Sequence, residues 1–488
     1  MKMVLGYGHD KIDLGGIFSS IIKERRLLEI NRRKIPSPLR NIDRKLKKAL
    51  IQPLGIISPL PELIKKSPHK SITIVIDDHT RSNQHTRILL PLLLHELQQM
   101  NINQEYIHIL IASGTHRPPS DDQLKEIVGE KIYHDWKHRI ISHDCDDNLF
   151  IAGYMEDGTP IELNNLVRDS GVIILLTDGE PHYFAGFAGG PKSLIPGICG
   201  RKITTSEHLL MFNPEGGFAE GVAQGLIDNN AVYKYKKKAV DILEKELAKS
   251  GTYIYNIMTV IVGGEIVYLE GGNVLETHLN CLDTVDAVYG GEIEKPADVV
   301  IISAAHLGIN LYQACKAFTS AVDAVKPGGR ILALAPCYEG FGNDAFRDLM
   351  KISADIFKDK LARDEKITEQ TIKGALLAIQ EIVMRNFVIG MQKPVALLVI
   401  LKHVGWKHIY MLQEGLTGAE QALLPFMDFL PISYKQNPVD VISDWIGSLE
   451  AESSGKYNYC LIDDPGRLVR ITGRKLYNPD NIFATQEI

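Results

Sequence analysis

The sequence VIILLTDGEPHYFAGFAGGPKSLIPGICGRKITTSEH, residues 172–208, decides how this chain is interpreted. Its apolar beginning is typical of a buried strand, which stops where polar and glycine residues start. The segment that follows is too rich in glycine for one helix, with five glycines between positions 186 and 200. It carries His182, Lys192 and, on a predicted helix, His208. Two imidazoles and one amine in such a segment indicate a functional site.

Two earlier segments share this organisation. An apolar strand predicted at 71–76 runs into Asp78 and Arg81, and a second strand at 106–112 runs into a loop that contains His116. Open α/β sheets bind ligands at the carboxyl ends of parallel strands. The repeated order of strand, polar loop and helix therefore predicts a parallel α/β sheet with a site along one edge.

The rest of the chain predicts a second α/β unit. The glycine-rich and charged residues 290–296 indicate a crossing between domains. We predict an N-terminal α/β domain at 1–287, a C-terminal α/β domain at 293–472 and a tail at 473–488 that packs back on the first domain. The other predicted elements are a basic helical stretch at 24–48, helices at 121–128, 311–324 and 345–386, a helical stretch from His208 to about 249, and strands at 253–267, 299–303, 330–335 and 394–401.

Composition limits the class of protein. A length of 488 residues predicts two or three domains, and 45% hydrophobic residues are typical of a globular protein. The net charge of −6 argues against a nucleic-acid partner. No apolar run approaches the roughly 20 residues of a membrane-spanning helix, so no membrane partner is expected. Six scattered cysteines without a CxxC pair favour a reducing cytoplasm.

The residue types alone leave several interpretations open. His116 and His182 are about equally plausible as acid/base groups and as structural histidines. Lys192 fits a surface lysine or a covalent lysine, whereas GFAGGPKS lacks the pattern of a phosphate-binding loop. His208 alone makes a poor metal site, since such sites usually have three or four protein ligands. Arg81, with Gln313 and Lys316 on one face of a predicted helix, suits carboxylate binding or a solvated surface.

Several motifs together resemble the lactate racemase family. They are DHTR at 78–81, GTHR at 114–117, PHYFAGFAGGPK at 181–192, His208, LYQACKA at 311–317 and EGFGN at 339–343. They occur in the family's order over roughly residues 70–475, and the spacings from His182 to Lys192 and from Lys192 to His208 also agree. The run at 181–192 is the most specific of these motifs.

This resemblance implies two α/β domains with mostly parallel sheets, an active-site cleft between them and a nickel-pincer nucleotide cofactor. Cofactor-biosynthesis enzymes would load the cofactor, and the substrate would be a small-molecule 2-hydroxy acid. By resemblance, His116 and His182 are the catalytic acid/base pair, Lys192 forms a thioamide link to the cofactor, and His208 ligates nickel. The remaining residues implied are Asp78, Gly189 and Gly190 at the cofactor and Arg81, Tyr312, Gln313 and Lys316 at the substrate carboxylate.

One departure concerns the substrate. The family's lactate enzymes carry a pocket tryptophan in a helix where this chain reads GALLAI at 374–379, and the chain's tryptophans lie elsewhere, at 136, 406 and 445. The expected activity is therefore racemisation or epimerisation of lactate or a larger 2-hydroxy acid. The alternatives are a non-catalytic ligand-binding homologue and a hydrolase with a protein-bound zinc, which would need a third protein ligand.

Overall fold

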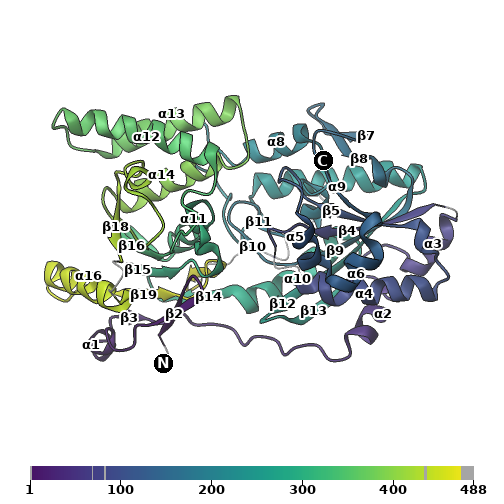
Figure 1. Ribbon diagram of the computed structural model, residues 1–488, viewed down its shortest axis with the longest axis horizontal. Helices are drawn as coiled ribbons and strands as arrows, with labels where there is room; N and C mark the ends of the chain where they lie inside the picture. The colour runs from purple at the N-terminus through teal and green to yellow at the C-terminus, as the bar shows by residue number, and fades with distance from the viewer. Residues whose placement is uncertain (1–2, 69, 82–83, 433–436, 474–488) are drawn as a thin grey trace. The chain divides into compact units, whose positions relative to one another are not determined.

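The computed structural model describes residues 3–68, 70–81, 84–432 and 437–473. The chain forms two compact units, each described here by itself (Figure 1). Unit 1 comprises Met1–Arg33, Phe212–Glu220 and Tyr289–Ile488, and unit 2 comprises Lys34–Met211 and Gly221–Val288. Both units are α/β with mostly parallel sheets, which confirms the predicted fold class. Apart from residue 473, the predicted tail at 473–488 lies outside the described residues.

Unit 2 is built on a six-stranded sheet with the order β13-β12-β9-β4-β5-β6. β12 and β13 are antiparallel, and every other adjacent pair is parallel. Because β9, β4 and β5 are parallel neighbours, their carboxyl ends lie at one edge of the sheet, as predicted. The strands are β4 (Ser71–Asp77), β5 (Ile107–Ala112), β6 (Ile140–Ser142), β9 (Ser170–Asp178), β12 (Tyr253–Val262) and β13 (Glu265–Gly272).

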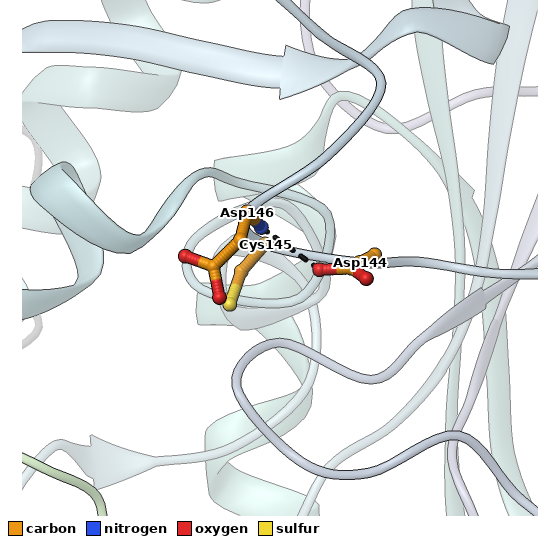
Figure 2. A group of neighbouring side chains, drawn as sticks. All are labelled: Asp144, Cys145 and Asp146. Carbon is orange, nitrogen blue, oxygen red and sulfur yellow. Dashed lines mark hydrogen bonds between the residues drawn. The ribbon is translucent and has the colours of Figure 1, made fainter.

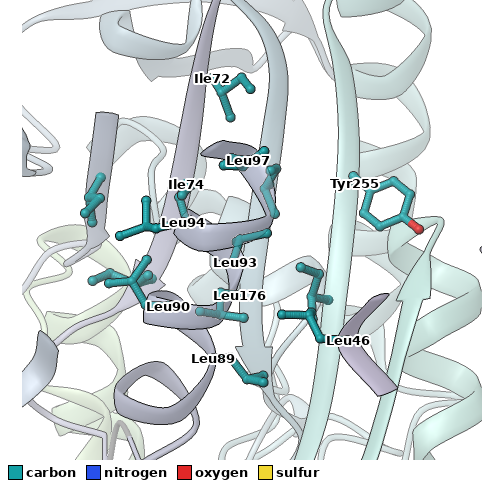
Figure 3. Close-up of a cluster of buried hydrophobic side chains, with 14 of the residues drawn as sticks. Leu46, Ile72, Ile74, Leu89, Leu90, Leu93, Leu94, Leu97, Leu176 and Tyr255 are labelled. Carbon is teal, nitrogen blue, oxygen red and sulfur yellow. The ribbon is translucent and has the colours of Figure 1, made fainter. Parts of the chain in front are cut away.

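Alternate residues of these strands enter two separate cores, since successive side chains point to opposite faces of a sheet. On one face, Ile74 of β4 and Leu176 of β9 pack with leucines of α4 (Gln84–Gln99), as Figure 3 shows. On the other face, Val75 packs in a cluster that includes residues of α9 (Ala231–Lys249). Helices therefore cover both faces, as is usual for parallel sheets. The first face also carries α2 (Ile42–Ile51), α3 (Leu60–Lys66), α5 (Asp121–Val128) and α6 (Glu130–Trp136).

Unit 1 has a six-stranded, entirely parallel sheet with the order β18-β17-β16-β15-β19-β3. One face packs against α11 and α14, and the other carries a core that includes Phe18 and Trp445. The strands are β3 (Leu27–Leu28), β15 (Ala297–Ser303), β16 (Val325–Leu334), β17 (Ile409–Gln413), β18 (Met427–Pro431) and β19 (Tyr459–Ile462). The helices are α1 (Ser19–Lys23), α11 (Leu311–Ala321), α12 (Asp344–Ala362), α13 (Glu369–Arg385), α14 (Gln392–Val404), α15 (Gly418–Gln421) and α16 (Pro438–Ser453).

The division of the chain differs from the predicted domains at two places. Residues 1–33, predicted in the first domain, belong to unit 1 for two reasons. Strand β3 adds to the sheet of unit 1 beside β19. The hairpin of β1 (Val4–Tyr7) and β2 (Asp10–Asp13) packs on the core of that unit. The segment Phe212–Glu220 also returns to unit 1. There Gln380 of α13 accepts a hydrogen bond from the Gly217 N–H at 2.8 Å and donates one to the Asn213 carbonyl at 2.6 Å.

Three secondary-structure predictions were wrong in part. The strand predicted at 394–401 is the middle of helix α14, whose apolar run is buried nearly all round, so periodicity could not separate the two structures. The stretch at 24–48 is helical only from Ile42 in α2. The helix that carries His208, α8 (Arg201–Leu209), ends at once, and α9 begins at Ala231. In the described ranges we find no helix both long and apolar enough to cross a membrane.

Candidate functional site

His116 and Asp78 meet at the carboxyl ends of the neighbouring strands β5 and β4. The Nδ1 of His116 lies 2.7 Å from Oδ2 of Asp78, and the Thr80 hydroxyl donates to Oδ1 of Asp78 at 2.6 Å. Burial alone would raise the pKa of Asp78, but the hydrogen bond and charge of His116 outweigh it and hold that pKa at about 2. The carboxylate therefore keeps a proton on Nδ1 of His116, which leaves Nε2 of the neutral ring as a proton acceptor.

At His182 the partner of Nδ1 is a hydrogen-bond donor, whereas at His116 it is an acceptor. It lies on β10 (Pro181–His182), which pairs with β11 (Gly186–Phe187) just beyond the end of β9. The Ala185 N–H donates to Nδ1 of His182 at 3.3 Å, so the proton of the neutral ring resides on Nε2. The rings of Tyr183 and Phe184 contact the imidazole at centroid distances of 5.2 and 4.6 Å. His116 thus offers an acceptor nitrogen and His182 a donor nitrogen.

The predicted carboxylate-binding residue Arg81 holds a carboxylate of the protein itself. Its guanidinium forms an ion pair with Glu180, a residue missing from the predicted site. Asp77 and Asp178 end β4 and β9 beside this pair. Burial raises the pKa of Asp77 to about 7 despite the charge of Arg81, and burial raises that of Asp178 well above its ordinary value. At neutral pH Asp77 and Asp178 therefore add less negative charge around Arg81 than two fully ionised carboxylates would.

His208 of α8 lies in a buried charged cluster. Its Nδ1 is 2.9 Å from the Thr204 carbonyl oxygen and 2.5 Å from Oε2 of Glu207, and both are acceptors. Nδ1 therefore carries a proton, and Nε2 has the lone pair that a metal ion requires. A carboxylate on the far nitrogen is the usual arrangement behind a metal-bound histidine. The ring of Phe184 lies 5.2 Å from that of His208, so Phe184 contacts both His182 and His208.

Glu207 is compensated by a lysine from another helix. Oε1 of Glu207 lies 2.7 Å from Nζ of Lys236 on α9, and both side chains are almost completely buried, at 0% and 3% exposure. Burial would raise the pKa of Glu207, but Lys236 and His208 together hold it at about 2. Glu207 therefore remains ionised beside His208, whose orientation is fixed by the hydrogen bond from Nδ1 to the Thr204 carbonyl.

The loop before Lys192 is shaped by two glycines with positive φ. A Cβ on Gly189 would lie 2.5 Å from the Asp178 carbonyl oxygen, and one on Gly190 would lie 2.9 Å from Cβ of His278 on α10 (Val274–Tyr289). Close packing against the protein itself therefore explains both glycines. Lys192 follows in the short helix α7 (Pro191–Leu194), and its charge lowers the pKa of Asp77, which places it near the strand-end residues.

The remaining predicted residues lie in unit 1 on α11. Asn310 caps this helix by accepting a hydrogen bond from the Gln313 N–H at 3.0 Å. Tyr312, Gln313 and Lys316 are half-buried, and Tyr312 and Lys316 share one face of the helix at i, i+4. Lys393 of α14 lies with Nζ 5.3 Å from the centre of the Tyr312 ring.

A thiol and two carboxylates come together elsewhere in unit 2, at Asp144, Cys145 and Asp146 (Figure 2). Their ligand atoms lie within 4.8 Å of one another. Arg201 forms an ion pair with Asp146 at 2.5 Å, and burial raises the pKa of the Cys145 thiol. A protonated thiol and a neutralised carboxylate are poor metal ligands, so this cluster is explained by its own counter-ion.

Sequence reasoning missed Glu180, Glu207, Lys236 and Lys393. Glu207 precedes His208 directly, but adjacent helical residues do not normally face each other, so the spacing gave no signal. Lys236 lies among the lysines of a helix that looks like a solvated surface. Glu180 could have been noticed two positions before His182.

Comparisons with known proteins agree with these motifs. Residues 15–219 match the model of the lactate racemase N-terminal domain, and residues 293–424 match that of the C-terminal domain. A lactate racemase of Thermoanaerobacterium thermosaccharolyticum is 31% identical over 316 residues, 64% of this chain and 69% of that protein. A lactate racemase of Lactiplantibacillus plantarum is 27% identical over 333 residues, 67% of this chain and 73% of that protein.

Two solved structures share the fold. The lactate racemase apoprotein from Thermoanaerobacterium thermosaccharolyticum aligns with a TM-score of 0.74 at 24% identity, over 96% of this chain and 100% of that chain. A protein from Thermotoga maritima aligns with a TM-score of 0.59 at 16% identity, over 90% of this chain and 100% of that chain. At these identities the likeness concerns the fold alone.

Proposed function

The chain belongs to the lactate racemase family, and from this premise we propose that it inverts the α-carbon of a small 2-hydroxy acid. The observation that supports this reaction most is the pair of opposite partners at Nδ1, a carboxylate for His116 and a backbone N–H for His182. Inversion through a 2-oxo acid requires one group that removes the hydroxyl proton and one that returns a proton to the same oxygen. His116 and His182 meet this requirement with Nε2 atoms of opposite protonation.

In one direction, Nε2 of His116 accepts the hydroxyl proton while the α-hydrogen leaves as hydride. The carbonyl oxygen of the planar 2-oxo acid then receives a proton from Nε2 of His182 when hydride returns to the opposite face. His182 gives this proton as the imidazolium, which forms by protonation of Nδ1 in place of the Ala185 contact. Asp78 stabilises the positive charge that develops on His116. The two histidines end with exchanged protonation states, and the reverse reaction restores them.

The α-hydrogen needs an acceptor, which the nickel-pincer nucleotide of this family supplies when bound. The donor chemistry of unit 2 fits that group. His208 presents one Nε2 lone pair, held by Glu207 and Lys236, and a single protein ligand suffices where the cofactor brings the other donors. Lys192 supplies a primary amine for the thioamide tether, beside Gly189 and Gly190.

Cationic residues would hold the substrate carboxylate. Lys316, with Tyr312 and Gln313, forms a polar face on α11, and Arg81 would exchange Glu180 for the substrate carboxylate. The aliphatic residues at 374–379, where the family's lactate enzymes carry tryptophan, favour a lactate-like or larger acid.

The test is a chiral chromatography panel of single-enantiomer 2-hydroxy acids, with the chain co-expressed with cofactor-making enzymes. We expect at least one acid to scramble at its α-carbon, a mass adduct on Lys192, and nickel in the purified chain. His116→Ala and His182→Ala should each abolish scrambling, while His134→Ala, at a histidine with 89% side-chain exposure, should not. An adduct-bearing chain that scrambles no acid would refute the reaction and favour a ligand-binding homologue.

A further inference from the structure

Lys393 is a cation in a place that disfavours positive charge. It is the second residue of α14, its side chain is only 1% exposed, and the N-terminal end of a helix carries partial positive charge. α14 packs against both α11 and the strand β16 of unit 1. A buried ammonium at this end of a helix costs stability, so a reason for its presence should lie nearby.

The neighbours of Lys393 are the residues predicted to bind an anion. Its Nζ lies 5.3 Å from the centre of the Tyr312 ring, a distance at which a cation interacts with the face of an aromatic ring. Burial, together with the like charge of Lys316, lowers the pKa of Lys393 to about 7. The titratable groups that face it from α11 are Tyr312, Cys315 and Lys316.

We propose that Lys393 is a second cation of the anion-binding face formed by Tyr312, Gln313 and Lys316, and that it acts as a positioning residue behind that face. This assignment rests on the proposed function, which gives the α11 face its anionic ligand. A carboxylate at Lys316 lies in the field of both ammonium groups and relieves their mutual repulsion. Anion binding and the charge on Lys393 therefore favour each other.

This coupling links binding to a proton. Above about pH 7 the uncharged form of Lys393 predominates in the free chain, so a bound carboxylate must draw a proton onto it. The affinity for the anion should then fall as pH rises from 6.5 to 9.

The test is NMR titration of the purified chain, without cofactor, with ¹³C-glycolate, the smallest 2-hydroxy carboxylate. The variants are Lys393→Met, which is close in shape and uncharged, Lys393→Arg, which keeps the charge, and Lys402→Met, a control on the same helix with 41% side-chain exposure. We expect the Kd of the native chain to rise at least tenfold from pH 6.5 to pH 9. Lys393→Met should weaken binding at least tenfold at pH 6.5 and remove the pH dependence.

Lys393→Arg should bind tightly at both pH values, and Lys402→Met should follow the native chain. The inference is overturned if Lys393→Met stays within twofold of the native chain at both pH values, or if the native chain does not bind glycolate. Failure of the proposed function is distinguishable, since it appears in the chirality panel. A chain that scrambles an acid but shows no effect of Lys393→Met keeps its function and loses this assignment.

Discussion

Replacing Lys236 by methionine removes the positive partner of Glu207 while keeping a side chain of similar length. In the native chain Nζ of Lys236 lies 2.7 Å from Oε1 of Glu207, and Oε2 of the same carboxylate lies 2.5 Å from Nδ1 of His208. The variant leaves a fully buried carboxylate with only the histidine beside it. The prediction is a large loss of stability confined to unit 2.

The magnitude follows from the burial of this pair. Breaking a buried ion pair by removing one partner costs about 3–5 kcal/mol, because the remaining charge stays buried. The lowered pKa of Glu207, about 2 against an ordinary 4.5, corresponds to a similar amount, about 3 kcal/mol of stabilisation of the ionised form. Since this pKa is lowered, the stabilisation is present above pH 4.5 and is lost as pH falls through about 2.

Hydrogen-exchange mass spectrometry of peptides from β9 and β12 measures the opening of unit 2 separately from unit 1. A loss of 3–5 kcal/mol should speed exchange of the slowest amides by about 10²–10⁴-fold. Lys238→Met, on the same helix but in an exposed pair with Glu156, should change stability by less than about 1 kcal/mol.

A double variant, Lys236→Met with Glu207→Gln, tests the cause. It removes both charges and should recover most of the loss, since neither partner is then left charged and buried. The loss in Lys236→Met should also shrink as pH falls from 8 to 5, because the unpaired Glu207 becomes protonated. If the double variant is as unstable as the sum of the single ones, the ion-pair reasoning is refuted.

Three further predictions follow from single contacts. Asp78→Asn should lower kcat about 10²–10⁴-fold with little change in KM, because His116 loses the carboxylate that keeps its proton on Nδ1. Unchanged initial rates would contradict this prediction. Gly190→Ala should lower the free energy of unfolding by about 1–3 kcal/mol, because φ is +50° and the new Cβ would meet α10 at 2.9 Å. Gly374→Ala, with no atom within 4 Å, should raise it slightly, and the Tm of each variant checks the direction. Lys393→Met should raise the free energy of unfolding, measured by urea titration, by up to about 4 kcal/mol at pH 7. Because the pKa of this lysine is lowered from 10.5 to about 7, the gain should fade as pH rises from 7 to 10.5.

The sequence predicted the sheet edge of unit 2 because each signal there was local. The apolar strands β4, β5 and β9 each end abruptly in polar residues, and parallel neighbours bring those ends together. The hydrogen bond between Asp78 and His116 follows from that register, and the contact between Arg81 and Glu180 joins the ends of β4 and β9 in the same way.

Other features depend on tertiary contacts that no local pattern records. The run at 394–401 is equally apolar as a buried strand and as the buried helix α14, and packing against α11 and β16 decides between them. Residues 1–33 join unit 1 through β3, a two-residue strand too short to be recognised from sequence. Lys236 reaches Glu207 only because α9 packs on α8.

Unit 2 places a histidine beside a carboxylate twice, and burial distinguishes the two proposed roles. In both His116 and His208 a carboxylate at Nδ1 leaves Nε2 as the nitrogen with a lone pair. The side chain of His116 is 40% exposed, so it can exchange protons with a substrate or with water. That of His208 is 6% exposed, and its carboxylate is already neutralised by Lys236. The buried Nε2 of His208 is therefore suited to holding a permanent ligand. The more exposed Nε2 of His116 is suited to repeated proton transfer.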